Sequence, residues 1–341
     1  LTSSPTPEVA ERARQAAEKA VALAPDRPEG YIARGGYRNL VLNDPVAAQT
    51  DYARALGLGA PSAELLQTKA TVERDLGHWD AAVDAFRQAE RLDPLAVGPK
   101  TMLGFTFLYL RRYPEARQSF DAGLALAPAN MTLIVLKAET FLGEANLSAA
   151  RAVLAAAPAE VERTGLTAYV AMGSDLGWVL DEAGRELLLR LTPAAFDNDR
   201  AVWAICLAQA SYLKGDASSG RRYAEEARQA FEEQARGAPQ NSLLHSNLGL
   251  ALAYLGQKDA AIREGERGVA LRPVARDAFT GPYHQHLLAR IYVLTGEPEK
   301  ALAILEQLLK IPYDAVSPGF LRIDPNFDAL RGNPKFLKLL E

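Results

Sequence analysis

The 341-residue chain contains little cysteine, little histidine and only a small net charge. Its single cysteine, Cys206, excludes an internal disulfide and a cluster of thiolate metal ligands. No stretch of about 18 consecutive apolar residues occurs, so no segment has the composition of a membrane-spanning helix. A formal net charge of −4 offers no basic surface for nucleic acid. With 48% hydrophobic residues, the chain instead has the composition of a protein that folds around a large core.

Motifs for catalysis and cofactor binding are also missing from the sequence. It contains no glycine-rich phosphate loop and no GxSxG nucleophile motif. His284 and His286 are two residues apart, so they cannot share a helix face as paired zinc-binding histidines do. Cys206 lies in an apolar stretch and is predicted to be a small, buried apolar residue. We therefore expect no catalytic residue, no cofactor and no metal, and we expect the chain not to be an enzyme.

The first half of the chain repeats itself with a period of 34 residues. Each copy has a small residue, an apolar residue four positions later, a small residue three positions after that, and then a proline. An earlier copy, which begins at Ala13, lies 35 residues before the first of these. The copies are Ala48/Tyr52/Ala55/Pro61, Ala82/Phe86/Ala89/Pro94, Ala116/Phe120/Gly123/Pro128 and Ala150/Leu154, the last of which ends early at Pro158.

This spacing predicts pairs of packed helices. Positions i, i+4 and i+7 lie on one helix face, where small residues let a second helix approach and the large residue fills the remaining space. A second helical stretch precedes each copy and has a small residue where the helices cross, namely Gly35, Ala70, Gly104 and Ala138. The breaker between the two helices is often glycine, as at Gly77, Gly143, Gly215, Gly256 and Gly296.

The second half continues the pattern with looser spacing, in steps of 41 and 40 residues. Its copies are Gly220/Ala224/Ala227/Pro239, Ala261/Gly265/Gly268/Pro273 and Ala301/Leu305/Leu308/Pro312. The 70 residues between Ala150 and Gly220 correspond to about two periods. We therefore expect one degenerate unit in 159–197, around Ala183, Leu187 and Pro193.

Together these residues resemble the tetratricopeptide repeat (TPR) over roughly 8–312. The stretch Asn247–Gly256 is similar to a typical first helix, whereas Gly265 departs from the pattern because a large apolar residue usually stands there. The resemblance implies an all-α, right-handed superhelical solenoid of antiparallel helix pairs with a concave groove. It also implies that the partner is a protein or peptide, further copies of the same chain included. From the charge and the lack of long apolar runs we expect neither nucleic acid nor a membrane as a partner.

The pattern divides the chain into five segments. We predict a linker with an N-terminal half-repeat in 1–25, four TPR units in 26–158, the degenerate unit in 159–197, three TPR units in 198–312 and a capping segment in 313–341. Residues 7–25 supply only the second helix of a unit, so an unpaired apolar face is expected there. The cap is predicted to cover the last repeat with Phe327, Leu330, Phe336, Leu339 and Leu340.

Two hypotheses about function follow. Ala289–Ala301 and Leu321–Phe336 resemble the end of TPR tails in bacterial multidomain regulators, which carry Ser/Thr kinase, nucleotide-cyclase or winged-helix domains. That resemblance implies a non-enzymatic scaffold or sensing module. The alternative is a structural subunit that assembles head to tail into a filament through the half-repeat. Because the chain begins at Leu1 rather than at Met, the sequence slightly favours the cell envelope or the exterior.

The partner-binding groove is expected to be lined by first helices. The residues predicted to line it are Gln67, Arg74, Phe105, Tyr109, Tyr283, His286 and Arg290. An aromatic ring beside an arginine is suited to anchor a peptide or a carboxylate. The alternative for the same residues is ordinary packing between turns of the superhelix.

Overall fold

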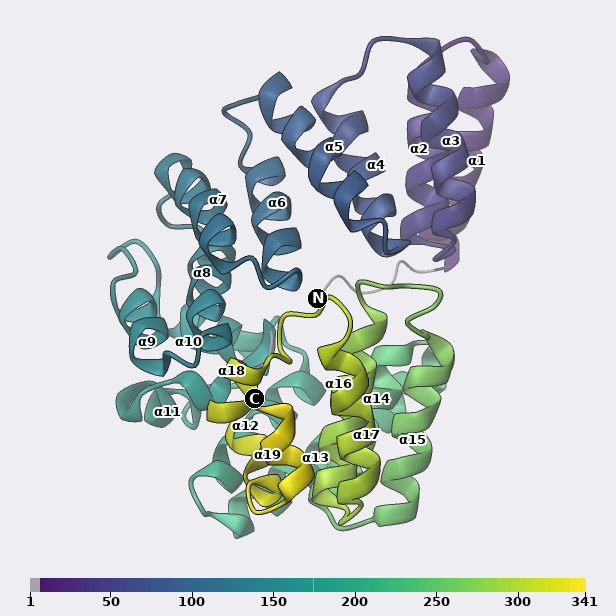
Figure 1. The fold of residues 1–341 in the computed structure, drawn as a ribbon. Helices are drawn as coiled ribbons and strands as arrows, with labels where there is room; N and C mark the ends of the chain where they lie inside the picture. Colours follow the sequence, from purple (N-terminus) through teal and green to yellow (C-terminus); the bar gives the residue numbers. More distant parts are fainter. Residues whose placement is uncertain (1–6, 174) are drawn as a thin grey trace. The chain divides into compact units, whose positions relative to one another are not determined.

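The computed structural model describes residues 7–173 and 175–341, and every regular element in these ranges is a helix (Figure 1). The helices pack in consecutive antiparallel pairs, which confirms the predicted all-α fold class. Most of the predicted N-terminal linker, residues 1–6, lies outside the described residues. Two compact units make up the chain, Leu1–Phe107 with Ala275–Phe279 and Leu108–Val274 with Thr280–Glu341.

The first unit contains a single helix followed by two helix pairs and most of a further helix. Its helices are α1 (Pro7–Leu23), α2 (Pro28–Leu40), α3 (Pro45–Leu58), α4 (Ala63–Asp75), α5 (Trp79–Leu92) and α6 (Val97–Tyr109), the last two residues of which belong to the second unit. Helices α3 and α4 begin at side-chain caps, where Asp44 and Ser62 accept hydrogen bonds from backbone amides.

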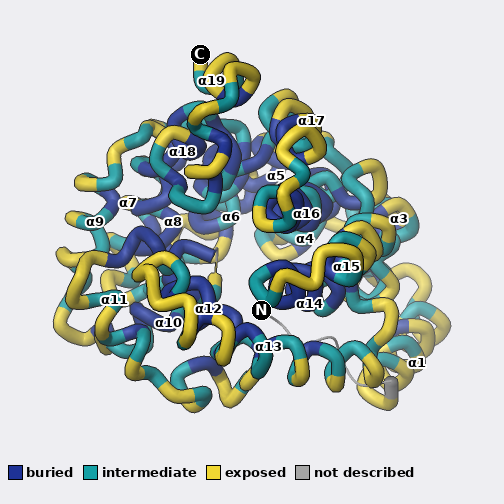
Figure 2. The backbone as a smooth tube through the Cα atoms, turned by 90° about the horizontal axis from the view of Figure 1, so that it is seen from below, coloured by how far each residue is buried: buried dark blue, intermediate teal, exposed yellow. Residues whose placement is uncertain are grey.

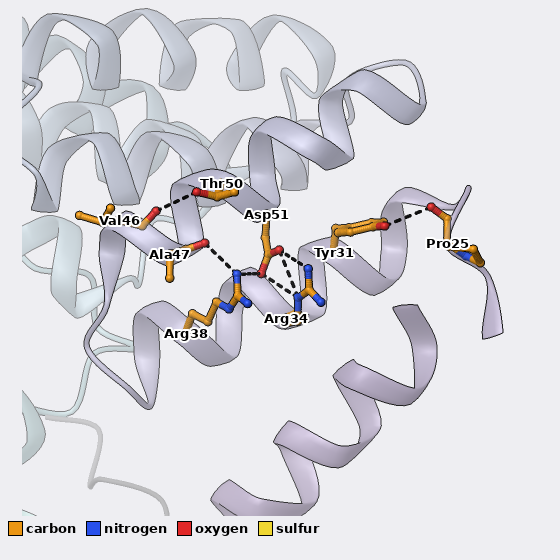
Figure 3. Close-up of polar contacts among 8 residues, drawn as sticks. All are labelled: Pro25, Tyr31, Arg34, Arg38, Val46, Ala47, Thr50 and Asp51. Atoms are coloured by element: carbon orange, nitrogen blue, oxygen red, sulfur yellow. Dashed lines mark hydrogen bonds and ion pairs between the residues drawn. The ribbon is translucent and has the colours of Figure 1, made fainter. Parts of the chain in front are cut away.

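Helices α2 and α3 cross where the repeat pattern predicts. A Cβ atom on Gly35 would lie 2.6 Å from the ring of Tyr52, so glycine is needed for this close approach. Beside the crossing, the buried carboxylate of Asp51 on α3 receives two arginines from α2 (Figure 3). Arg34 Nη2 lies 2.6 Å from Asp51 Oδ1, and Arg38 Nη1 lies 2.9 Å from Asp51 Oδ2. A bidentate partner and a second cation offset the cost of burying this charge.

The second unit contains the remaining pairs, an irregular region and a terminal segment. The pairs are α8 (Met131–Gly143) with α9 (Leu147–Ala155), α12 (Arg200–Leu213) with α13 (Ala217–Gly237), α14 (Ser242–Tyr254) with α15 (Lys258–Leu271) and α16 (Gly281–Leu294) with α17 (Pro298–Leu309), and α7 (Tyr113–Leu126) packs on α8. The irregular region comprises α10 (Arg163–Gly173), η1 (Gly177–Val179), α11 (Glu182–Leu188) and η2 (Pro193–Phe196). The terminal segment comprises α18 (Pro318–Ile323), η3 (Pro325–Leu330) and α19 (Pro334–Leu339).

The core of the second unit lies along its first helices. Figure 2 shows α14 mainly in the colour of buried residues, whereas α15 exposes its outer side. The departure at Gly265 has a packing reason. A Cβ atom there would lie 2.7 Å from Ile291 Cδ1, so α16 supplies the large apolar group that α15 lacks. The backbones of α14 and α15 also approach closely, because a Cβ on Gly249 would lie 2.8 Å from the amide nitrogen of Gly265.

Each regular pair has a left-handed residue in the turn between its helices. These residues are Asn43, Gly77, Arg111, Ala145, Gly215, Gly256 and Gly296. The first four follow one another at 34-residue intervals, so the repeat fixes the backbone conformation even where the residue is not glycine. Gly143, which the sequence predicts as the breaker between α8 and α9, is not itself in the left-handed conformation. Gly143 ends α8, and Ala145 has the positive φ of 61°.

The terminal segment packs back onto the second unit. Phe327, Leu330 and Phe336 are at most 2% exposed, and Leu339 and Leu340 are half-buried. Ser317 caps α18 and donates a hydrogen bond from Oγ to the carbonyl of Gly143, 3.2 Å away. The segment therefore contacts α8 as well as the helices of the last pair.

Candidate functional site

Two of the three predicted groove residues of the first unit, Arg74 and Phe105, contact residues 275–279 of the same unit. Arg74 is 5% exposed, and its guanidinium lies 3.4 Å from the ring centroid of Phe279. Phe105 is half-buried and meets the same ring edge to face at 5.3 Å. The backbone amide of Ala278 donates to the carbonyl of Asp75 at 2.8 Å, which fixes the segment on α4. Gln67 is half-buried and lies against Gly98.

Two predicted groove residues of the second unit form an aromatic cluster with the terminal segment. His286 stacks on Phe327 at 5.8 Å, and its Nδ1 lies 3.0 Å from the hydroxyl of Tyr313. Tyr109 packs edge to face on the same tyrosine at 5.8 Å. Burial, together with the charge of Arg290, lowers the pKa of His286 to about 3, so the imidazole is neutral at physiological pH.

Tyr283 and Arg290 converge on a buried carboxylate that sequence reasoning did not identify. Arg290 is 1% exposed, and its Nη1 lies 3.1 Å from Asp175 Oδ2. The hydroxyl of Tyr283 donates to the same oxygen at 2.9 Å, and Gln209 donates to Oδ1 at 3.4 Å. Burial alone would lower the pKa of the Arg290 guanidinium, but the charge of Asp175 acts in the opposite direction, and the net effect raises this pKa. This arrangement ties α16 to the residues that follow α10.

The structure therefore places the predicted groove residues mainly inside the two units. Four of the seven are at most 5% exposed: Arg74, Tyr109, His286 and Arg290. Their aromatic and charged groups already have partners within the chain, which favours packing as their role. Gln67, Phe105 and Tyr283 are only half-buried. That any of these seven residues binds a partner stays a prediction.

A pocket opens instead in the irregular region of the second unit. Helix α9 has 9 residues and α11 has 7, whereas α7 and α15 have 14 each. At 1.5 Å per residue, five missing residues leave about 7.5 Å of the neighbouring helix uncovered. The chain breaks α9 at Ala156, after which Pro158 prevents its continuation. The result is a pocket of about 410 Å³ between α9, α10 and α11.

The lining of this pocket combines aliphatic side chains with positive charge. Its apolar lining residues include Leu154, Leu166, Val170 and Leu187. Three arginines from three different elements also line it, Arg151 on α9, Arg163 on α10 and Arg190 after α11. The volume falls in the range of ligand-binding pockets, about 300–1,000 Å³. We call this set of residues the α9–α11 pocket.

Two arginines of the α9–α11 pocket, Arg151 and Arg190, are held by backbone carbonyls rather than by carboxylates. Arg151 donates to the carbonyls of Val179 and Leu180, at 2.7 and 3.3 Å. Arg190 donates to the carbonyl of Glu186 at 3.2 Å, and Arg163 is exposed at the start of α10. None of the ion pairs in the described part of the chain involves these three residues. Asp181 is the acidic residue of the lining, and its carboxylate caps α11 by accepting from the amide of Gly184.

Other features of the described residues concern metal, membrane and thiol chemistry. Within 7–173 and 175–341, no three histidine, cysteine, aspartate or glutamate side chains cluster in a way that could hold a metal ion. No helix in these ranges is both long and apolar enough to span a bilayer. Cys206 is buried as predicted, and burial raises the pKa of its thiol well above the usual range.

Comparison with known proteins identifies the repeat. The tetratricopeptide-repeat family profile matches residues 285–314, which cover most of α16 and α17. The small glutamine-rich tetratricopeptide repeat-containing protein 2 of Mycosarcoma maydis is 28% identical over 98 residues, which are 29% of this chain and 28% of that protein. The crystal structure of yeast Tom70 matches 93% of this chain and 63% of its own, with a TM-score of 0.55 and 15% identity.

Residues 285–314 therefore match the tetratricopeptide repeat in sequence, and the helix pairs of the chain are similar in fold to the structure of Tom70. A further structural match, the APC/C hetero-tetramer Cut9–Hcn1, has 16% identity and a TM-score of 0.43 over 96% of this chain and 58% of that one. The chain thus spans less than a third of its curated relative and less than two thirds of these two solved chains. At such identities the likeness to the solved structures concerns the fold.

The TPR pattern explains why the α9–α11 pocket was missed by sequence reasoning. The repeat marks where helices cross, but the pocket exists where the pattern fails. Two signals were present in the sequence, namely the early stop at Pro158 and the loss of period in 159–197. Both indicate shortened helices, and shortened helices leave the faces of their neighbours uncovered.

Proposed function

We propose that this TPR protein is a non-enzymatic module that binds other proteins and serves as a scaffold or sensing part. The observation that carries the proposal is the stacking of TPR helix pairs in both units. A helix pair buries one face against its neighbours and presents the other, which is how repeat proteins build long surfaces for partners. The open α9–α11 pocket gives one such surface the apolar depth that a peptide side chain requires.

Two finer hypotheses stay predictions. The first is that the chain is the tail of a bacterial multidomain regulator. The second is head-to-tail assembly through α1, for which an apolar exposed face was expected. Val9 and Leu23 are exposed on α1, but Arg14 also pairs with Glu11 and Glu18 at 2.6 Å each. These ion pairs are typical of a helix side that faces water, so this feature does not favour assembly.

Selection from a random-peptide display library tests the proposal. The folded protein is immobilised and panned, with the same protein unfolded in urea and an unrelated helical protein as controls. Enrichment of peptides on the folded protein alone is the expected result. Failure to enrich any peptide beyond the level of both controls, over repeated rounds, would contradict a peptide-binding function.

A further inference from the structure

We propose that the α9–α11 pocket binds a partner segment that combines carboxylates with one or two large aliphatic or aromatic side chains. This inference rests on the proposed function and names the class of partner. The pocket comes from an interruption of the repeat, so it differs from the groove formed by regular first helices. Among the described residues, its lining contains aliphatic side chains and no aromatic ring.

The interior of the pocket determines the apolar part of the partner. Among its lining residues, Val170 and Leu166 are buried, whereas Leu154 and Leu187 are half-buried and still reach solvent. When a leucine or phenylalanine of the partner enters the pocket, its own apolar surface and that of Leu154 and Leu187 are removed from water. Burying one such side chain contributes roughly 1.5–3 kcal/mol. The pocket volume of about 410 Å³ admits a small number of side chains rather than a whole helix.

The charge around the pocket determines the polar part of the partner. The lining contains three arginines and one aspartate, so it is positively charged although the whole chain has a formal net charge of −4. A guanidinium matches a carboxylate in geometry and binds it through two parallel N–H donors. Arg151 is already oriented by two carbonyls, so less conformational freedom is lost when it takes up a further acceptor.

The distribution of these arginines favours an acidic peptide over other anions. The three guanidinium groups come from three elements around the pocket, and a single fatty-acid carboxylate engages one or two of them. A nucleic acid offers several anions, but its bases stack on aromatic rings, which the lining lacks. A peptide with two or three carboxylates spaced around a leucine satisfies both the charge and the apolar interior.

Binding of a designed probe to the full chain tests the inference. The probe is a fluorescein-labelled 12-residue peptide with two leucines and four glutamates, and its control has glutamine in place of every glutamate. Fluorescence anisotropy is expected to show saturable binding of the acidic peptide and at least about tenfold weaker binding of the control. Dodecanoate is added as a competitor, and tighter binding of dodecanoate than of the peptide would overturn the proposal.

Three variants separate the pocket from the rest of the surface. Ala183 is exposed at the pocket, so Ala183→Trp fills it and should weaken the probe by at least about tenfold. Arg163→Glu reverses one charge at the first residue of α10, where an acidic side chain is compatible with the helix. It should weaken binding about fivefold, and by a smaller factor in high salt. Arg221→Glu changes an exposed arginine of α13 outside the pocket and should leave binding unchanged. Circular dichroism checks that all three variants fold.

The outcomes distinguish the two proposals. If peptides selected from the display library bind Ala183→Trp and Arg163→Glu as well as they bind the original chain, the pocket assignment is wrong and peptide binding stands. Equal losses in Arg163→Glu and Arg221→Glu would reduce the effect to overall charge and overturn the pocket assignment. If neither the library nor the probe yields binding, both proposals fail.

Discussion

Replacing Gly319 with alanine tests how closely the terminal segment packs on α8. Gly319 is the second residue of α18, and an added Cβ would lie 2.0 Å from the carbonyl oxygen of Gly143. It would also lie 2.8 Å from Gly143 C and 3.0 Å from the amide nitrogen of Ala145. All three are backbone atoms, so no side-chain rotation relieves the overlap. Because ordinary contacts begin at 3.4 Å, the two segments must move apart.

The magnitude follows from three opposing effects. Overpacking costs about 1–3 kcal/mol, and loss of the Ser317 hydrogen bond to Gly143 adds about 1 kcal/mol. Alanine is favoured over glycine inside a helix by about 1 kcal/mol, which acts in the opposite direction. We therefore expect Gly319→Ala to lower the free energy of unfolding by about 1–3 kcal/mol. Helix propensity alone predicts the opposite sign.

Urea unfolding followed by circular dichroism measures the effect, and hydrogen–deuterium exchange shows whether α18 and η3 are released first. Gly332→Ala is the matched control, because nothing lies within 4 Å of the added Cβ. The control should change stability by less than about 0.5 kcal/mol. A Gly319→Ala protein as stable as the original chain, or as the control, would refute the packing argument.

Three further predictions concern the second unit. Arg111 has a positive φ, and its guanidinium donates to the carbonyls of four residues between 308 and 316, so Arg111→Gly should destabilise the protein by about 2–4 kcal/mol. Ala145 also has a positive φ but makes no such side-chain contacts, so Ala145→Gly only relieves backbone strain and should stabilise the protein by about 1 kcal/mol. Thermal unfolding in which both substitutions change stability in the same direction would contradict this. Arg290→Met leaves the carboxylate of Asp175 buried without its cation and should lower the free energy of unfolding by about 3–5 kcal/mol. Adding Asp175→Asn to this variant should restore part of the lost stability. A double-mutant cycle in which the two effects are strictly additive would argue against the ion pair. Burial raises the pKa of Asp314 from 3.8 to about 6, so the native state keeps this proton longer than the unfolded chain and stability falls as pH rises from about 4 to 6. Asp314→Asn should thus stabilise by about 1–3 kcal/mol at pH 8 and much less at pH 4, and urea titrations showing an equal gain at both values would exclude this cause.

The sequence by itself determined the helix pairs and their crossings. Small residues at fixed spacing create a crossing locally, because a helix approaches only where no side chain stands between the backbones. Gly35 against Tyr52 is a crossing that could be identified from the repeat alone. The left-handed residues in the turns follow the same 34-residue spacing, although the sequence did not show that Ala145 rather than Gly143 adopts that conformation.

Only the tertiary structure decided which polar side chains are exposed. Arg290 and Tyr283 share a helix face with the spacing of a binding surface, yet both contact Asp175, more than 100 residues away in sequence. The α9–α11 pocket likewise depends on how far neighbouring helices extend over one another. Periodicity assigns a residue to a face, but burial depends on what the rest of the chain places against that face, and sequence spacing carries no information about such distant contacts.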